Sequence, residues 1–253
     1  MKARKRFGQN FLHDPQLIAR IIDSISPSPE QRIVEIGPGR GAITMPLVDS
    51  GCDLTVIEID RDLAAQLRNL YPGIKLIEAD VLKFDFNELD DDIRIVGNLP
   101  YNISTPLLFK LFRQFRQIQD MYFMLQLEVV QRLVAAPNSE HYGRLSVMSQ
   151  YYCDAALQFT VPPEAFTPQP KVTSAIVRLT PKRERLLANN EERFANLVNQ
   201  AFSMRRKTLR NALKGFVVAE AYIALDIDPI RRPETLSMED FIHLANFVTD
   251  TGI

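Results

Sequence analysis

Three glycines spaced by two positions, at the end of a short apolar run, most restrict how this chain can fold. Residues 34–41 read VEIGPGRG, and the apolar residues that follow recur at helical spacing. The pattern predicts a strand, a tight loop and a helix, because glycine lets the backbone approach a ligand closely and the first helical amides can face an anionic group. A nucleotide-like cofactor is the favoured ligand. The pattern alone does not decide the class of cofactor, because NAD sites share it, as do ordinary turns without a ligand.

Four predicted strands each end at a polar residue. They span 32–36, 54–60, 74–77 and 93–96. Helical patterns separate the first three strands, which indicates parallel pairing in an open α/β sheet, where ligands bind beyond the carboxyl ends of the strands. The residues expected to converge at that edge are Glu35, Gly37, Glu58, Asp80 and Asn98.

The remaining apolar runs extend this sheet. Asp14 and Pro15 are typical of a helix start, so a helix is expected ahead of the first strand. Further strands, which bring the sheet to seven, are predicted at 121–125, 157–161 and 172–179. The proline-rich segment 162–170 is too long for a simple turn and is a candidate functional loop.

Length and spacing together predict two domains. A chain of 253 residues that is 46% hydrophobic can form one large domain with its own core and a smaller one. Beyond Pro181 every apolar pattern is helical. We therefore predict a mostly parallel α/β sheet domain over 1–181, which would bind the cofactor, and a small all-α domain over 182–253.

Composition argues against a membrane protein and a metal protein. No apolar stretch approaches the length of a bilayer span, and the basic N-terminus is not followed by an apolar signal core. A soluble, cytoplasmic protein without membrane association is expected. The two cysteines, Cys52 and Cys153, and the three histidines are scattered, so neither a disulfide framework nor a metal site is predicted.

The charges are segregated along the chain. The net charge of −1 by itself argues against a nucleic-acid partner. However, basic runs lie at 2–6, 182–185 and 205–214, whereas the acidic excess gathers at 85–92. A solvated face explains the run at 182–185 equally well. It explains the run from Arg205 less well, because helical spacing there would gather the cations on one side.

Glu58 and Asp80 fit an adenosine-containing cofactor. A carboxylate at the end of the second strand can accept both hydroxyls of a ribose, in NAD and in S-adenosylmethionine alike. Such a residue is often only a helix cap, but Asp60 suits that role better than Glu58. Asp80, after the third strand, can accept a hydrogen bond from the exocyclic amine of adenine.

The stretch Asn98-Leu99-Pro100-Tyr101 favours an amine nucleophile over a hydride acceptor. The Asn98 amide oxygen and the Leu99 carbonyl can accept the two N–H bonds of an adenine N6, which aims its lone pair at a methyl group. Pro100 restricts Leu99 to extended geometry. Tyr101 offers a stacking face worth about 1–3 kcal/mol per base. A turn followed by a core tyrosine is the alternative, which the glycine loop makes less convincing.

Six stretches carry a specific resemblance over nearly the whole chain. They are 4–12, 35–41, 98–104, 142–147, 166–172 and 205–211. Together they resemble the ribosomal RNA adenine dimethyltransferases, specifically the bacterial 16S dimethyladenosine transferases. One departure is Leu127, where the family usually has lysine, which weakens the expectation of an RNA contact there but touches no cofactor position.

The resemblance implies a class I, Rossmann-like methyltransferase fold with a helical C-terminal domain that binds RNA. It implies contacts to S-adenosylmethionine at Asn10, Leu12, Gly37, Gly39, Glu58, Asp80 and Asn98. It assigns catalysis to Asn98, Leu99, Pro100 and Tyr101, with the target base flipped out between Tyr101 and Phe166. Expected RNA contacts are Arg4, Lys5, Arg6, Arg205, Arg206, Lys207 and Arg210.

The leading hypothesis is dimethylation at N6 of two adjacent adenosines near the 3′ end of 16S rRNA, by a monomer acting on the small subunit or its precursor. Resistance-type dimethylation of 23S rRNA is an alternative, although the stretches from Phe166 and Arg205 resemble the 16S type. A ribosome-assembly factor without chemistry is a second alternative, which the intact Glu58, Asp80 and Asn98 disfavour. DNA adenine methyltransferases typically have Asp-Pro-Pro-Tyr instead.

Overall fold

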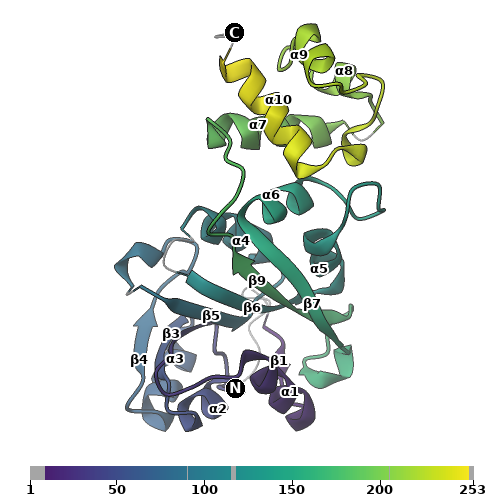
Figure 1. Ribbon diagram of the computed structural model, residues 1–253. Helices are drawn as coiled ribbons and strands as arrows, with labels where there is room; N and C mark the ends of the chain where they lie inside the picture. Colours follow the sequence, from purple (N-terminus) through teal and green to yellow (C-terminus); the bar gives the residue numbers. More distant parts are fainter. Residues whose placement is uncertain (1–8, 90, 115–117, 205, 251–253) are drawn as a thin grey trace. The chain divides into compact units, whose positions relative to one another are not determined.

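The computed structural model describes residues 9–89, 91–114, 118–204 and 206–250. Its internal contacts divide the chain into two compact units (Figure 1). The first takes in the chain up to Val130 together with Asp154–Pro181. The second takes in Gln131–Cys153 and the chain from Lys182 onward.

The predicted boundary after residue 181 coincides with one break between the units, but it leaves 131–153 in the wrong unit. Helix α6 (Arg144–Tyr152) packs against α7 (Glu191–Ser203) and α10 (Met238–Asp250), which the sequence placed in the C-terminal domain. Its apolar residues show only that it is a helix, not which helices it packs against. The C-terminal unit is therefore built from two separate stretches of sequence.

A seven-stranded sheet forms the centre of the first unit, as predicted. Its strands are β2 (Arg32–Ile36), β3 (Asp53–Glu58), β4 (Lys75–Glu78), β5 (Ile93–Asn98), β6 (Ile118–Gln126), β7 (Cys153–Val161) and β9 (Ser174–Pro181). The order in space is β4-β3-β2-β5-β6-β9-β7. The pairs from β4 to β6 are parallel, and β9 runs antiparallel to β6. The expected class of a mostly parallel α/β sheet is confirmed.

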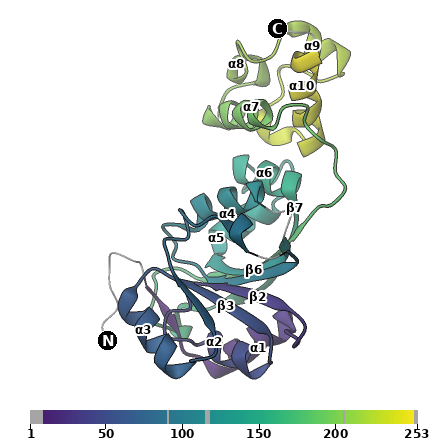
Figure 2. The same cartoon turned by 90° about the vertical axis from the view of Figure 1, so that its left-hand side faces the viewer.

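Helices cover both faces of this sheet (Figure 2). Helices α1 (Pro15–Ile25), α2 (Thr44–Asp49) and α3 (Arg61–Leu70) lie on one side, and α4 (Ser104–Arg113) lies on the other. The central strands are consequently buried on both faces, and their buried residues are consecutive rather than alternating. Apolar burial against the helices therefore stabilises the sheet and fixes the edge at which its parallel strands end.

Two capping carboxylates set where the first helices begin. The side chain of Asp14 accepts hydrogen bonds from the backbone N–H groups of Gln16 and Leu17, with Pro15 at the first helical position. Asp60 accepts from the N–H of Asp62, which ends β3 at Glu58 rather than at the predicted residue 60.

None of the helices in the described ranges is long and apolar enough to span a membrane.

A second, very small sheet was not predicted. Strand β1 (Phe11–Leu12) pairs antiparallel with β8 (Phe166–Thr167), which lies inside the proline-rich segment 162–170. Strands of two residues show no periodicity, so no sequence pattern marks them. The pairing ties the N-terminal segment to the loop that the sequence singled out.

Helices form the second unit, as expected. Besides α6, α7 and α10 it contains α8 (Leu209–Ala212) and α9 (Ala219–Ala224). Phe194, Leu197 and Phe241 are buried in its core, and the ring of Tyr151 lies 4.6 Å from that of Phe194. The apolar periodicity beyond residue 181 therefore marks the core face of these helices.

Two cations of the run 182–185 are used inside the second unit. The Lys182 ammonium donates to the Gln150 carbonyl at 2.9 Å. The Arg185 guanidinium lies 4.0 Å from the centre of the Tyr151 ring and pairs with Glu191 at 2.8 Å. The interpretation of this run as a solvated face is wrong for both residues.

Candidate active site

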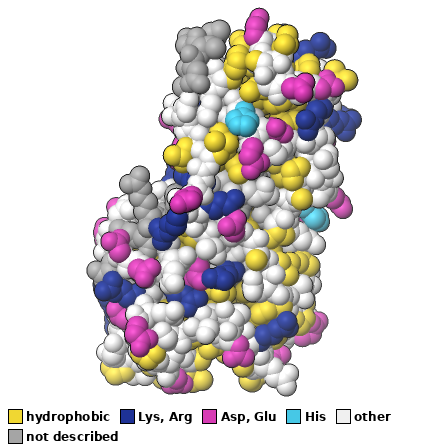
Figure 3. Space-filling model, in the orientation of Figure 1, with side chains coloured by type: hydrophobic (Ala, Val, Ile, Leu, Met, Phe, Trp, Pro, Cys, Tyr) yellow, Lys and Arg dark blue, Asp and Glu magenta, His cyan; other side chains and the backbone are white. Residues whose placement is uncertain are grey.

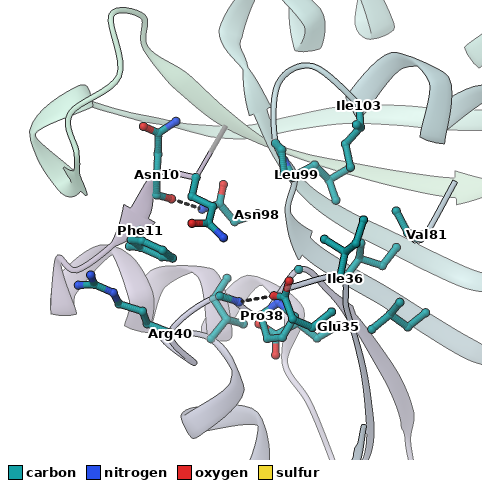
Figure 4. A pocket seen from close by; sticks show the side chains of 18 of the residues that line it. Asn10, Phe11, Glu35, Ile36, Pro38, Arg40, Val81, Asn98, Leu99 and Ile103 are labelled. Atoms are coloured by element: carbon teal, nitrogen blue, oxygen red, sulfur yellow. Dashed lines mark hydrogen bonds between the residues drawn. The ribbon is translucent and has the colours of Figure 1, made fainter. Parts of the chain in front are cut away.

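A cavity lies where the parallel strands of the first unit end (Figure 4). Its walls come from β1, from the loop after β2, and from the ends of β3, β4 and β5. The five polar and glycine positions expected to converge all line it: Glu35, Gly37, Glu58, Asp80 and Asn98. The strand-end argument therefore located the cavity correctly.

The glycine loop adopts backbone angles that other residues rarely reach. Gly37, Gly39 and Gly41 have φ values of 65°, 58° and 85°. A Cβ on Gly39 would lie 3.3 Å from the ring of Phe11, which the N-terminal segment lays over the loop. The Arg40 guanidinium lies 4.3 Å from the centre of the same ring, so the loop and the N-terminal segment hold each other (Figure 4).

Glu58 is buried at the cavity and positioned by backbone donors. Its two carboxylate oxygens accept the N–H groups of Gly39 at 3.3 Å and Asp60 at 2.8 Å. Burial raises the pKa of Glu58, which these hydrogen bonds partly offset. Each carboxylate oxygen keeps a further lone pair, so Glu58 can still accept hydroxyl groups of a ligand.

Glu35 is a second buried carboxylate at the cavity, as its place near the end of β2 predicted, although no specific cofactor contact was assigned to it. The Thr44 hydroxyl donates to it at 2.6 Å. Burial raises the pKa of Glu35 to about 7, and the nearby Glu58 carboxylate adds to that rise. An acidic residue in the middle of an otherwise apolar strand, just before the glycines, was the available signal.

Asp80 lies on the cavity wall after β4. One of its carboxylate oxygens accepts the N–H of Leu82 at 3.0 Å. This hydrogen bond fixes the direction of the Asp80 side chain and leaves its second carboxylate oxygen for a ligand. Val81 and Leu82 add apolar surface beside it, which suits a flat ring such as a purine.

The orientation of the Asn98 amide is decided by its neighbour. The Asn98 nitrogen donates to the Asn10 carbonyl at 3.0 Å (Figure 4). A carbonyl can only accept a hydrogen bond, so the side-chain atom that faces Asn10 must be the amide nitrogen, and the amide oxygen of Asn98 points away from Asn10. None of the described residues donates a hydrogen bond to this oxygen. Leu99 is anchored next to it, because its N–H donates to the Met124 carbonyl at 3.2 Å. Two acceptors therefore sit on a rigid backbone at the cavity.

Tyr101 lines the cavity and is fixed at its far end. Its hydroxyl lies 2.8 Å from the Ser174 hydroxyl, and the Ser104 hydroxyl donates to its carbonyl at 3.0 Å. Burial raises the pKa of Tyr101, and the bond with Ser174 lowers it in part. Pro100 also lines the cavity, and its carbonyl accepts the N–H of Ile103 at 3.1 Å.

Phe166 is placed differently from the other predicted catalytic residues. Its side chain is only 3% exposed and belongs to the apolar cluster that contains Leu12, its partner in the small sheet. It is not among the described residues that line the cavity, whereas Asn10 and Leu12 are. The stacking role expected of Phe166 stays a prediction.

None of the predicted RNA contacts that the structure describes is among the residues that line this cavity. Arg206, Lys207 and Arg210 are exposed residues of the second unit. Arg206 and Lys207 lie in a turn before α8, so the helical spacing expected for this run is wrong for them, and only Arg210 lies on the helix. Four further predicted contacts lie outside the described residues: Arg4, Lys5, Arg6 and Arg205.

Comparison with known proteins identifies the family. A sequence model described as "Ribosomal RNA adenine dimethylase" matches residues 1–250. The chain belongs to this family. The predicted resemblance is thereby confirmed, and with it the expectation that the protein is an enzyme that methylates adenine in ribosomal RNA.

Several similar proteins of this dimethylase family cover nearly the whole chain. The protein named Ribosomal RNA small subunit methyltransferase A in Acinetobacter baylyi is 52% identical over 97% of this chain and 92% of its own length. Its namesake in Hahella chejuensis is 54% identical over 98% and 94%. At this identity, the family likeness extends through both units.

Two solved structures share the fold. A dimethyladenosine transferase from Plasmodium falciparum superposes with a TM-score of 0.84 at 27% identity, covering 96% of this chain and 98% of that one. The 23S rRNA methyltransferase ErmE gives 0.73 at 27% identity, covering 93% and 98%. The expected Rossmann-like methyltransferase fold with a helical C-terminal domain is confirmed.

Proposed function

We propose that this protein dimethylates two adjacent adenosines near the 3′ end of 16S rRNA at N6. Family membership supports adenine as the target, and the names of the relatives point to the small subunit. The observation that carries the chemistry is the Asn98 amide, whose nitrogen is bonded to Asn10 and whose oxygen is kept as an acceptor at the cavity. A role in small-subunit biogenesis accompanies this activity.

The cavity fits S-adenosylmethionine, the cofactor that membership of this family implies. That molecule carries a methyl group on a positively charged sulfur and supplies it when bound. The glycine loop allows a close backbone approach, Glu58 has lone pairs for the ribose hydroxyls, and Asp80 can accept the adenine amine. Asn10, Leu12, Gly37 and Gly39 complete the walls around it.

Positioning accounts for most of the proposed catalysis. The adenine N6 lone pair is delocalised into the ring, so the amine is a poor nucleophile. When the Asn98 oxygen and the Leu99 carbonyl accept its two N–H bonds, the nitrogen becomes pyramidal and its lone pair is aimed for in-line attack. The methylated amine sheds its proton readily, so no side-chain base is required.

The target base must leave the RNA helix to reach these acceptors. Tyr101 offers its ring at the cavity, and stacking there offsets part of the cost of flipping the base. Phe166 would form the second face of this stack if the loop carrying it rearranged when RNA binds, because its ring is buried without RNA.

The proposed roles are divided between the two units. The first unit holds the cofactor and the base, and the second unit binds RNA through Arg206, Lys207 and Arg210. Positive and negative side chains are intermixed on the face of the first unit displayed in Figure 3, so this face offers phosphate groups no uniformly positive surface. We further propose a monomer in the cytoplasm that needs no metal.

Methyl transfer to small ribosomal subunits tests this proposal. Labelled S-adenosylmethionine, the purified protein and unmethylated small ribosomal subunits should give N6,N6-dimethyladenosine in 16S rRNA. Naked 23S rRNA and DNA serve as controls and should remain unlabelled. Label in 23S rRNA and none in the small subunit would instead establish the resistance-type activity, and binding to the subunit without label would establish a non-catalytic assembly factor.

A further inference from the structure

We infer that Ser174 is a positioning residue that holds the Tyr101 ring in the orientation needed to receive the target base. The inference rests on the proposed function of Tyr101 in base capture. The observation behind it is the 2.8 Å contact between the hydroxyl groups of Tyr101 and Ser174, which joins residues 73 positions apart. Neither the polar strand ends nor the family motifs gave Ser174 a role.

The sheet topology explains why a residue of β9 reaches the active site. Parallel strands β5 and β6 end at the cavity edge, but β9 runs antiparallel to β6 and therefore begins there. Ser174 is the first residue of β9 and lies opposite Gln126, the last residue of β6. Tyr101 follows the end of β5 by three residues. The antiparallel strand thus contributes its first side chain to a site that is otherwise built from strand ends.

Ser174 is a fixed anchor. Its side chain has 0% exposure, and β9 lies between β6 and β7 in the sheet. The residue before it is held as well, because the Thr173 carbonyl accepts the N–H of Leu127 at 3.0 Å. Most buried hydroxyls are hydrogen-bonded, and the partner of Ser174 is the Tyr101 hydroxyl. The position of the phenol oxygen is consequently set by the sheet.

Two attachments leave the Tyr101 ring little freedom. At its backbone, the Ser104 hydroxyl bonds the Tyr101 carbonyl, and at its other end Ser174 bonds the phenol oxygen. A ring ordered before binding loses less conformational entropy when a base stacks on it. Its plane also decides where a stacked adenine places N6 relative to the Asn98 oxygen. Ser174 should therefore act on capture of RNA and not on binding of the cofactor.

A double-mutant cycle separates this role from simple filling of space. Ser174→Ala and Tyr101→Phe each remove the contact while keeping the ring, and we expect each to raise the KM for small subunits about 2- to 10-fold. The double variant should be no worse than either single one, because both changes delete the same interaction. The affinity for S-adenosylmethionine should stay at the wild-type value in all three.

Ser149→Ala is the matched control. Ser149 is equally buried, but its hydroxyl has no hydrogen-bond partner among the described residues, so its loss should leave the KM unchanged. A direct readout comes from NMR of the protein labelled with 13C-tyrosine, without RNA. The Tyr101 ring should flip faster in Ser174→Ala than in the wild type or in Ser149→Ala.

Three outcomes overturn the inference, and they are distinguishable from failure of the proposed function. Additive effects in the cycle, or an unchanged ring-flip rate in Ser174→Ala, contradict the role of Ser174 even when Tyr101→Ala impairs RNA capture. A wild-type KM in Tyr101→Ala would remove Tyr101 from base capture, and the role of Ser174 with it. In that case methyl transfer by the wild type would still support the enzyme itself.

Discussion

At the scale of single residues, the Asn98 amide gives the sharpest test of the chemistry. Its oxygen is one of two acceptors for the adenine amine, so its loss should fall on the chemical step. We expect Asn98→Ala to lower the single-turnover rate at saturating RNA by about 100-fold or more, since the bond aims the attacking nitrogen. A rate close to wild type under those conditions would show that the proposed role is wrong.

The aromatic residues supply the comparison for Asn98. Tyr101→Ala should lose stacking, and its rate should recover at least in part when RNA is saturating. Phe166→Ala is less informative, because Phe166 is buried and its truncation costs stability of about 3–5 kcal/mol. Phe166→Leu, which keeps most of the apolar volume, is the better variant for that position.

Glu58 tests the cofactor site. Replacing Glu58 by Ala removes a charged acceptor, and we expect the affinity for S-adenosylmethionine to fall about 10- to 150-fold, which corresponds to about 1.5–3 kcal/mol. Calorimetry on the folded variant measures this. Glu78→Ala is the control, because Glu78 pairs with Glu58 in register on the neighbouring strand but does not line the cavity. Equal affinities in all three proteins would exclude Glu58 from the site.

Glu35 predicts a pH dependence of stability. Its pKa is raised from 4.5 to about 7 by burial, so the folded state binds a proton that the unfolded state has already released in this range. The wild type should therefore lose stability as pH rises from about 4.5 to 8. Relative to Glu35→Gln, the loss should be on the order of 3 kcal/mol. Urea unfolding at several pH values measures it, and parallel curves for the two proteins would refute the assignment.

Which residues could be predicted depends on how they reach the cavity. Glu58, Asp80 and Asn98 each follow an apolar strand, so one rule about parallel sheets located all three. Ser174 and Phe11 reach the site from distant parts of the chain, and their contacts follow from tertiary pairing that no local pattern encodes. Phe166 was assigned through the family motif alone, and its burial in the core could not be read from that motif.

At the scale of elements, Gly97 tests the close pairing of the central strands. A Cβ on Gly97 would lie 2.7 Å from the backbone oxygen of Ile36, and β2 is held on its other side by β3. Neither strand can move away, so Gly97→Ala should lower the free energy of unfolding by about 3 kcal/mol. Urea unfolding measures this.

Gly73→Ala is the matched control for that variant. A Cβ on Gly73 would have nothing within 4 Å, so this variant should be neutral or stabilised by up to about 1 kcal/mol. Equal stabilities of the two alanine variants would mean that the strands can separate, contrary to the packing described above.

Elements with a strong periodic pattern were the predictable ones. Strand 32–36 has its predicted bounds, because a buried run is ended by the glycines on one side. Strand β9 begins at Ser174 rather than at residue 172, since Thr173 bonds Leu127 outside the ladder. The small sheet of β1 and β8 escaped prediction because its stability comes from burying Leu12 and Phe166, not from its own sequence.

At the scale of the whole molecule, the described cations of the basic runs at 182–185 and 205–214 differ in whether they have partners within the protein. Lys182 and Arg185 bond to groups within the second unit, whereas Arg206, Lys207 and Arg210 are exposed. Both runs look alike in the sequence, because formal charge does not reveal which cations have internal partners. Arg206, Lys207 and Arg210 are therefore available for phosphate groups, whereas Lys182 and Arg185 are already bonded within the unit.

This difference leads to a prediction about RNA binding. Changing Arg206, Lys207 and Arg210 together to Ala should weaken binding to 16S rRNA and flatten its salt dependence, because each phosphate contact contributes about 0.7–0.9 to the logarithmic slope. A reduction of the slope by about 2–3 is expected, with unchanged affinity for the cofactor. The measurement is binding of 16S rRNA at several salt concentrations.

A control with the same loss of charge separates these contacts from a general effect of net charge. Arg61, Lys75 and Arg113 are also exposed and lie on three different elements of the first unit, so their joint replacement by Ala should change the slope less. If both triple variants change the slope equally, the run from Arg206 acts only through the overall charge of the molecule. If neither triple variant changes the slope, other residues bind the RNA, and the assignment of RNA binding to the second unit must be revised.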